Sequence, residues 1–132
     1  EIDRPVSIHS RGTLDEILNL IPSYDCLIAC LHWFDGTERD LQKSMDRGLY
    51  VSFGPPVVYS RNKKKLLNLA DRNRILIETD GPVRYSGCFN NVTSLPTNML
   101  TTILDTMSHE LKMTFEESMC LVSTNSNMFF NG

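Results

Sequence analysis

Short apolar runs alternate with amphipathic segments along this chain. Four runs, each bounded by turn residues, occupy residues 5–9, 27–32, 49–54 and 75–80. Between them, apolar side chains recur at helical spacing from Leu14 to Ile21 and after Thr37, which with Asp40 matches a helix capping box. A basic amphipathic segment at 60–70 predicts a third helix. Apolar runs that alternate with helical patterns are typical of buried parallel strands. The pattern therefore predicts an α/β fold of about four βα units.

Two more helices are expected after a long loop. Residues 81–94 carry Gly, Pro, Asn and Ser without periodicity and predict a loop, and loops of this length in compact domains are often functional. Apolar residues at helical spacing then mark one helix from Leu95 to Met107. Thr114 with Glu117 matches a capping box at the start of the last helix.

The polar residues of the predicted strands fall on one face of the sheet. Because successive side chains of a strand point to opposite faces, Glu78 and Asp80 share one face and the isoleucines of the same run share the other. The same alternation places His9 and His32 opposite the apolar residues that would contact the helices. In a barrel this face points inward, which permits the polar side chains to converge.

His9, His32 and Asp80 each stand at the downstream end of an apolar run. The carboxyl ends of parallel strands form the functional face of α/β sheets and barrels. Imidazole and carboxylate are usual ligands of Zn, Mn, Fe or Ni. Taken singly, each residue has another explanation, as a hydrogen-bonded strand-end histidine or, for the aspartate, as a helix N-cap. The shared placement of all three favours a metal site.

Three further residues lie beside these candidates. Arg11 can bind an anionic group of a substrate or form a surface salt bridge. Glu78 lies one inward layer below Asp80, where it can orient a metal ligand or pair within the interior. A buried carboxylate without a partner is costly, so a partner is expected. Trp33 either lines the pocket or packs under a loop.

Composition and charge restrict the class of protein. The 132 residues suit a single domain, 1–132, and 41% hydrophobic with 22% charged residues is typical of globular proteins. No apolar stretch approaches the roughly 20 residues of a membrane span and no signal peptide is evident, so we expect a cytoplasmic protein without a membrane partner. A net charge of −3 does not suggest a general nucleic-acid-coating surface, but it permits a nuclease because divalent cations can supply positive charge.

The cysteines and the start of the chain lead to two further expectations, one on the state of the thiols and one on the extent of the chain. Cys26, Cys30, Cys88 and Cys120 include no CxxC pair, and we expect reduced, buried thiols. The chain begins at Glu1 directly before a predicted strand, without Met, which leads us to expect a fragment or a processed chain.

Several motifs follow one another in a specific order. They are Pro5-Val-Ser-Ile-His9-Ser10-Arg11, His32-Trp-Phe-Asp-Gly36, Gly48-Leu-Tyr-Val-Ser-Phe-Gly54, Glu78-Thr-Asp80-Gly-Pro82 and the closing Ser123-Thr-Asn-Ser-Asn127-Met-Phe-Phe130. With them the chain resembles the TatD family of metal-dependent hydrolases, which are amidohydrolase-like TIM barrels. The resemblance spans nearly the whole chain and implies the second half of such a barrel, about four βα units plus C-terminal helices.

The resemblance also implies a chemistry. His9 and His32 would ligate one metal of a two-metal site, and Asp80 would ligate the other or activate water as a catalytic residue. The implied cofactors are divalent ions (Mg, Mn or Zn), two in the complete barrel. The implied reaction is hydrolysis of phosphodiester bonds by a TatD-type deoxyribonuclease, with DNA or another phosphoester as substrate.

The chain departs from the family pattern in several places. The family's first-strand His-x-His pair and its bridging Glu lie upstream of the residues present. Position 33 is Trp where a small residue is common, and Ser86-Gly87-Cys88 and Ser94-Leu95-Pro96 replace a proline-rich loop and an acidic residue. A half-barrel leaves strand edges unpaired and its interior open. We therefore expect weak metal binding, little hydrolysis and self-association through those edges.

Two other functions are kept as alternatives. One is amide or lactone hydrolysis by an amidohydrolase-like enzyme, which would leave DNA intact. The other is a non-catalytic barrel fragment that serves as an interaction module, which an upstream His-x-His motif would rule out.

Overall fold

The computed structural model describes residues 4–82, 84–93 and 95–131, so Glu1 and Ser94 lie outside the described residues. Its centre is one parallel sheet in the order β1-β2-β3-β4. The strands are β1 Val6–His9, β2 Ala29–His32, β3 Tyr50–Phe53 and β4 Ile75–Ile77. The predicted order of the βα units is confirmed.

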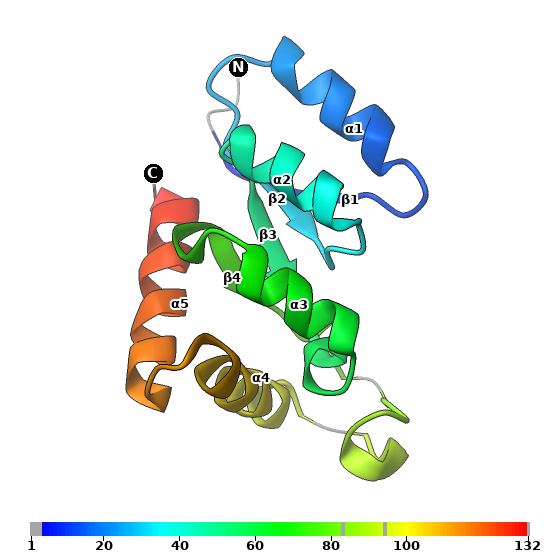
Figure 1. Cartoon of the computed structure of the whole chain (residues 1–132), viewed down its shortest axis with the longest axis vertical. Helices are drawn as coiled ribbons and strands as arrows, with labels where there is room; N and C mark the ends of the chain where they lie inside the picture. The colour runs from blue at the N-terminus through cyan, green and yellow to red at the C-terminus, as the bar shows by residue number, and fades with distance from the viewer. Residues whose placement is uncertain (1–3, 83, 94, 132) are drawn as a thin grey trace.

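Helices connect consecutive strands and lie in a row on one side of the sheet (Figure 1). They are α1 Leu14–Leu20, α2 Glu38–Asp46 and α3 Arg61–Leu69. Short 3₁₀ turns occupy Ile21–Ser23, Pro55–Val58 and Arg72–Arg74. Within the described residues, no helix combines the length and the apolar character that crossing a bilayer demands.

Local sequence signals set the helix ends. At the start of α2, the Thr37 N–H donates to the Asp40 carboxylate at 2.9 Å and the Asp40 N–H donates to the Thr37 hydroxyl at 3.3 Å, which confirms the capping box. Ser60 caps α3 by accepting from the Lys63 N–H. Gly48 follows α2 with φ +68°, a left-handed conformation that glycine adopts without strain.

The two faces of the sheet have the predicted character. The outer face belongs to the main core, whose fully buried residues include Leu31, Val51 and Ile75. The inner face carries a second, smaller cluster formed by Cys30, Tyr50, Leu76 and Phe129. This alternation confirms the assignment of residues to faces, because neighbours in one strand take part in different clusters.

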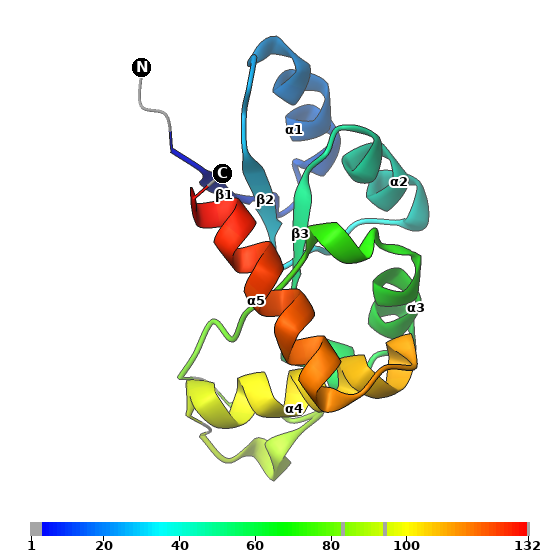
Figure 2. The same cartoon turned by 90° about the vertical axis from the view of Figure 1, so that its left-hand side faces the viewer.

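Two long helices complete the chain, α4 Pro96–Leu111 and α5 Phe115–Asn131. Figure 2 shows α4 at the end of the molecule away from α1, with α5 extending from α4 along the sheet. The Thr114 N–H donates to the Glu117 carboxylate at 2.7 Å and the Glu117 N–H donates back to the Thr114 hydroxyl at 3.1 Å. The second predicted capping box is thus confirmed.

A buried amide attaches α5 to the start of β4. Asn125 is 3% exposed, and its side-chain N–H groups donate to the carbonyls of Arg72 at 2.7 Å and Ile75 at 2.8 Å. One helical turn later, Phe129 lies edge-on to Tyr50 with 5.2 Å between ring centroids. The last helix therefore closes part of the inner face near the amino ends of the strands.

The fourth strand is shorter than the predicted run to Asp80. Regular pairing ends at Ile77, and the Glu78 N–H still donates to the Phe53 carbonyl at 3.1 Å. Asp80 has φ +48°, a conformation outside the β region, so the strand cannot continue through it. The aperiodic segment that follows contains the 3₁₀ turn Phe89–Asn91 and an isolated bridge between Arg84 and Thr93.

All four cysteines are free thiols, as expected. Their burial differs from the expectation: Cys30 is buried, Cys88 is half-buried, and Cys26 and Cys120 are exposed. Cys26 precedes β2 with φ +58°, in a turn rather than in the strand, which explains its exposure.

Candidate functional site

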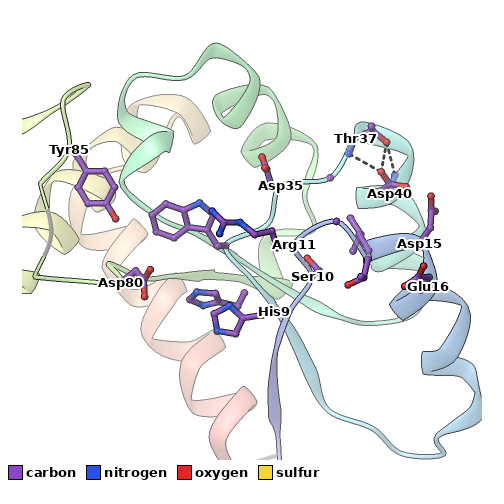
Figure 3. Close-up of a pocket in the computed structure, with 16 residues that line it drawn as sticks. His9, Ser10, Arg11, Asp15, Glu16, Asp35, Thr37, Asp40, Asp80 and Tyr85 are labelled. Carbon is purple, nitrogen blue, oxygen red and sulfur yellow. Dashed lines mark hydrogen bonds between the residues drawn. The ribbon is translucent and has the colours of Figure 1, made fainter.

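A pocket of about 870 Å³ opens at the carboxyl ends of the strands. Its walls come from the ends of β1 and β2, the turns that follow them, and the segment after β4 (Figure 3). Five of the six residues predicted from the sequence line it, namely His9, Arg11, His32, Trp33 and Asp80. The shared edge of a parallel sheet thus brings together side chains from segments far apart in the chain.

The two imidazoles are neighbours. His9 and His32 are the last residues of β1 and β2 and face each other in the parallel register. Their ring centroids are 4.2 Å apart and their planes are inclined by 47°. Two imidazoles at this separation can contribute to one cation site, because both are good ligands of Zn and Mn.

Glu78 orients the second of these imidazoles. Its Oε2 lies 2.5 Å from Nδ1 of His32, and the two side chains are 14% and 18% exposed. A carboxylate on one ring nitrogen holds a proton there and leaves the other nitrogen as a lone-pair donor. This contact leaves the other ring nitrogen of His32 available as a ligand atom, and the partner expected for this carboxylate is present.

The other oxygen of Glu78 binds the turn after β2. Oε1 accepts from the Trp33 N–H at 2.6 Å and from the Ser52 hydroxyl. The same N–H lies 3.0 Å from Ser52 Oγ. This network joins β2, β3 and β4 on the inner face and fixes Trp33, whose φ of +51° is unusual for a residue with a side chain.

Asp80 lies on the same pocket wall but does not complete a three-ligand cluster. Across the part of the chain that the structure describes, no group of three or more His, Cys, Asp or Glu side chains is placed to hold a metal ion. The regular strand has ended before Asp80, whose backbone is left-handed. The donors nonetheless fit a divalent cation in kind, as two imidazoles and a carboxylate that supply part of a ligand shell.

The pocket wall is rich in carboxylates. Of the described residues that line it, Arg11 is the single Lys or Arg side chain, beside the acidic residues Asp15, Glu16, Asp35, Asp40 and Asp80. Lysines from neighbouring helices neutralise some of this charge: Lys63 lies 2.6 Å from Asp35 and Lys43 lies 2.9 Å from Asp15. A phosphate group would need an added cation to be held near the strand ends.

The basic run of the third helix is engaged in ion pairs. Lys63 pairs with Asp35, Lys64 with Glu110 at 3.0 Å, and Lys65 with Glu38 at 2.5 Å. Their exposure differs, since Lys65 is 60% exposed whereas Lys63 is only 12% exposed, and the ion pairs tie the helix to its neighbours.

Two site residues were not identified from the sequence. Ser52 has a detectable signal, because it interrupts an apolar strand at an inward position. Tyr85 has none, since it lies in an aperiodic loop. Its hydroxyl donates to the Thr79 carbonyl at 3.0 Å, and its ring stacks on Trp33. Burial, together with the nearby Asp80 carboxylate, raises the pKa of Tyr85 to about 12.

The fold and the pocket define a class. Four parallel strands, helices on the outer face and a polar pocket at the carboxyl ends are the features of a β/α barrel, here about half of one. The family model described as "TatD related DNase" matches residues 1–131. The chain belongs to this family.

Relatives agree with this assignment. The "Uncharacterized metal-dependent hydrolase YabD" of Bacillus subtilis is 25% identical over 134 residues, which cover 98% of this chain and 52% of the relative. The "3'-5' ssDNA/RNA exonuclease TatD" of Citrobacter rodentium is 37% identical over 87 residues, 62% of this chain and 33% of the relative. The human "Deoxyribonuclease TATDN3" is 30% identical over 81 residues, 61% of this chain and 30% of the relative.

Solved structures show the same fold. The TatD homologue YjjV of Escherichia coli superposes with a TM-score of 0.83 at 19% identity and covers 97% of this chain and 50% of its own. A TatD family hydrolase of Entamoeba histolytica gives 0.76 at 19% identity, with 96% and 50% covered. The chain therefore spans about half the length of these structures and of the Bacillus relative.

Proposed function

We propose that this chain contributes part of the active site of a divalent-metal-dependent hydrolase of phosphodiester bonds, acting on DNA or another phosphoester. The observation that carries the proposal is the pair of imidazoles at adjoining strand ends, His9 and His32, the second of which is oriented by Glu78. Both open on the pocket that Asp80 and Arg11 line.

Each residue has a distinct task. His9, His32 and Asp80 would hold the divalent ions (Mg, Mn or Zn), which number two in a complete barrel. Such an ion, when bound, makes hydroxide available near neutral pH and stabilises charge on phosphate oxygens. Arg11 would bind a nonbridging phosphate oxygen, and Asp80 would act either as a ligand of the second ion or as the base that accepts a proton from the attacking water.

The printed names of two relatives support the choice of substrate. The Citrobacter relative is named an exonuclease of single-stranded DNA and RNA and the human relative a deoxyribonuclease. The acidic wall of the pocket supports the need for metal, since phosphate would otherwise be repelled there.

The edges of the sheet support a second proposal, which concerns self-association of the chain. β1 and β4 are the edge strands, and Val6 on β1 is 37% exposed. Unpaired parallel edges of this kind favour association with a further set of strands. We propose self-association of the 132-residue chain through these edges and a cytoplasmic location.

Hydrolysis of a 5′-labelled single-stranded DNA with Mn²⁺ tests the function. At high protein concentration we expect slow, Mn²⁺-dependent shortening of the strand. His9→Ala should reduce it to background, whereas His109→Ala, which removes an exposed histidine of α4 outside the pocket, should not.

Three outcomes would count against these proposals. Absence of metal-dependent cleavage, or cleavage unaffected by His9→Ala, would remove the nuclease assignment. Hydrolysis of lactone or amide substrates with DNA left intact would favour the amidohydrolase-like alternative. A monodisperse monomer with a tightly bound metal and robust activity would show that the half-barrel needs no completion.

A further inference from the structure

Two aromatic side chains lie together on the pocket wall. The rings of Trp33 and Tyr85 are inclined by only 18°, with centroids 6.1 Å apart. Both line the pocket that contains His9, Arg11 and Asp80. In Figure 3, Tyr85 and Asp80 occupy the same side of the pocket, facing Arg11. A stacked aromatic pair thus stands beside the residues proposed for catalysis.

The pair is not part of the hydrophobic core. Neither ring belongs to the two buried clusters, and both residues are partly exposed. The next residue, Phe34, shows the contrast, because it is 1% exposed and belongs to the main core. Phe34 therefore supplies the core packing in this turn, and core packing does not account for the position of Trp33.

The position of Trp33 is fixed from two directions. Its backbone N–H is held by Glu78 at 2.6 Å and Ser52 at 3.0 Å. Its indole lies against Gly54, where an added Cβ would come within 2.5 Å of the ring. Position 54 thus has to be glycine for the ring to lie there, and the indole is presented with little conformational freedom.

Tyr85 is held independently. Its hydroxyl donates to the Thr79 carbonyl at 3.0 Å, so the ring is tied to the segment just before Asp80. Two rigid rings with aligned planes are a suitable surface for a third planar ring.

We propose that Trp33 and Tyr85 form a stacking surface for an unpaired nucleobase of a single-stranded nucleic acid. This inference rests on the proposed function and names the part of the substrate that the site recognises. Base stacking on aromatic side chains is tolerant of sequence and typically contributes about ten-fold or more to affinity for each base. Stacking matters more here than in a basic groove, because this acidic pocket attracts phosphate weakly. Among the described lining residues, Arg11 is its one Lys or Arg.

The chain contains a single tryptophan, which makes the proposal directly measurable. Intrinsic fluorescence is followed while a phosphorothioate thymidine oligonucleotide, which resists hydrolysis, is added in the presence of Mg²⁺. An abasic oligomer of the same length and charge is the control ligand. We expect the thymidine oligomer to quench the fluorescence of Trp33 and the abasic oligomer to leave it unchanged.

Variants extend the test to affinity, measured by anisotropy of a labelled thymidine oligomer. Trp33→Leu should weaken binding about ten-fold, Trp33→Phe should weaken it less because an aromatic face is kept, and Tyr85→Leu should weaken it about five-fold or more. Tyr24→Leu, which removes an exposed tyrosine outside the pocket, is the matched control and should leave the affinity unchanged. Circular dichroism establishes that each variant is folded.

Equal quenching by the abasic oligomer, or a folded Trp33→Leu variant with unchanged affinity, would overturn the proposal. Failure of the hydrolysis test, by absent cleavage or by cleavage unaffected by His9→Ala, concerns the proposed function and leaves the quenching result intact. Conversely, if His9-dependent hydrolysis is found and Trp33→Leu does not raise KM, the nuclease assignment stands and the stacking surface is rejected.

Discussion

Replacing Glu78 by alanine should destabilise the fold measurably. This carboxylate connects three strands, since it contacts His32 Nδ1 at 2.5 Å, accepts from the Trp33 N–H at 2.6 Å and accepts from the Ser52 hydroxyl. Hydrogen bonds to a charged group contribute about 1.5–3 kcal/mol each. The sum is reduced by two compensations: the Trp33 N–H still reaches Ser52 Oγ at 3.0 Å, and a half-buried charge is removed.

The net cost of Glu78→Ala is therefore about 2–3 kcal/mol in the free energy of unfolding. Ser52→Ala should cost about 1 kcal/mol on its own. Because both side chains take part in one network, the double variant should cost less than the sum, with a coupling of about 1 kcal/mol. Glu78→Gln keeps an acceptor of the same shape and should lie between the alanine variant and the unsubstituted chain.

Urea unfolding followed by circular dichroism measures these free energies. The reasoning is refuted if Glu78→Ala unfolds within about 0.5 kcal/mol of the unsubstituted chain. Strict additivity of Glu78→Ala and Ser52→Ala would also refute it, because the shared hydrogen bond would then carry no energy.

Three further predictions concern α5, α2 and the thiols. Asn125→Ala should cost about 2 kcal/mol because two backbone carbonyls, one of them buried, lose their donors, whereas Asn127→Ala, exposed on the same helix, should be nearly neutral in urea unfolding. Hydrogen bonds from the Thr37 hydroxyl and N–H lower the pKa of Asp40 below its ordinary value of 3.8. The capping contribution of Asp40, about 1 kcal/mol, is therefore fully present above pH 3.8 and is lost as the pH falls through the lowered pKa. This loss should be absent from the acid unfolding curve of Asp40→Asn. Burial raises the pKa of the Cys30 thiol to about 12, so iodoacetamide at pH 8 should modify the exposed Cys26 in the folded chain and reach Cys30 only after unfolding, as peptide mass spectrometry would show.

The periodic part of the fold could be predicted from the sequence. Strand order, the two faces of each strand and both capping boxes depend on local spacing, and the structure confirms them. The neighbouring positions of His9 and His32 also follow from periodicity, because both residues end adjacent parallel strands.

The remaining features depend on backbone conformations and long-range packing that the hydrophobic periodicity of the sequence does not encode. The fourth strand ends at Ile77 rather than at Asp80, and Asp80 itself has a left-handed backbone conformation. The stacking of Tyr85 on Trp33 depends on how an aperiodic loop folds back, and the space for the indole depends on a glycine one strand away. Such long-range contacts have no counterpart in the spacing of residues.

The histidine signals provide the most direct test of the central claim, that His9 and His32 bind a divalent cation together. The chain contains three histidines, and His109, 80% exposed on α4, is an internal reference. In imidazole ¹H–¹⁵N spectra, substoichiometric Mn²⁺ should broaden the signals of His9 and His32 together while that of His109 stays sharp, and Asp80→Asn should require more Mn²⁺ for the same effect. Equal broadening of all three histidines, or broadening of His109 first, would contradict the account.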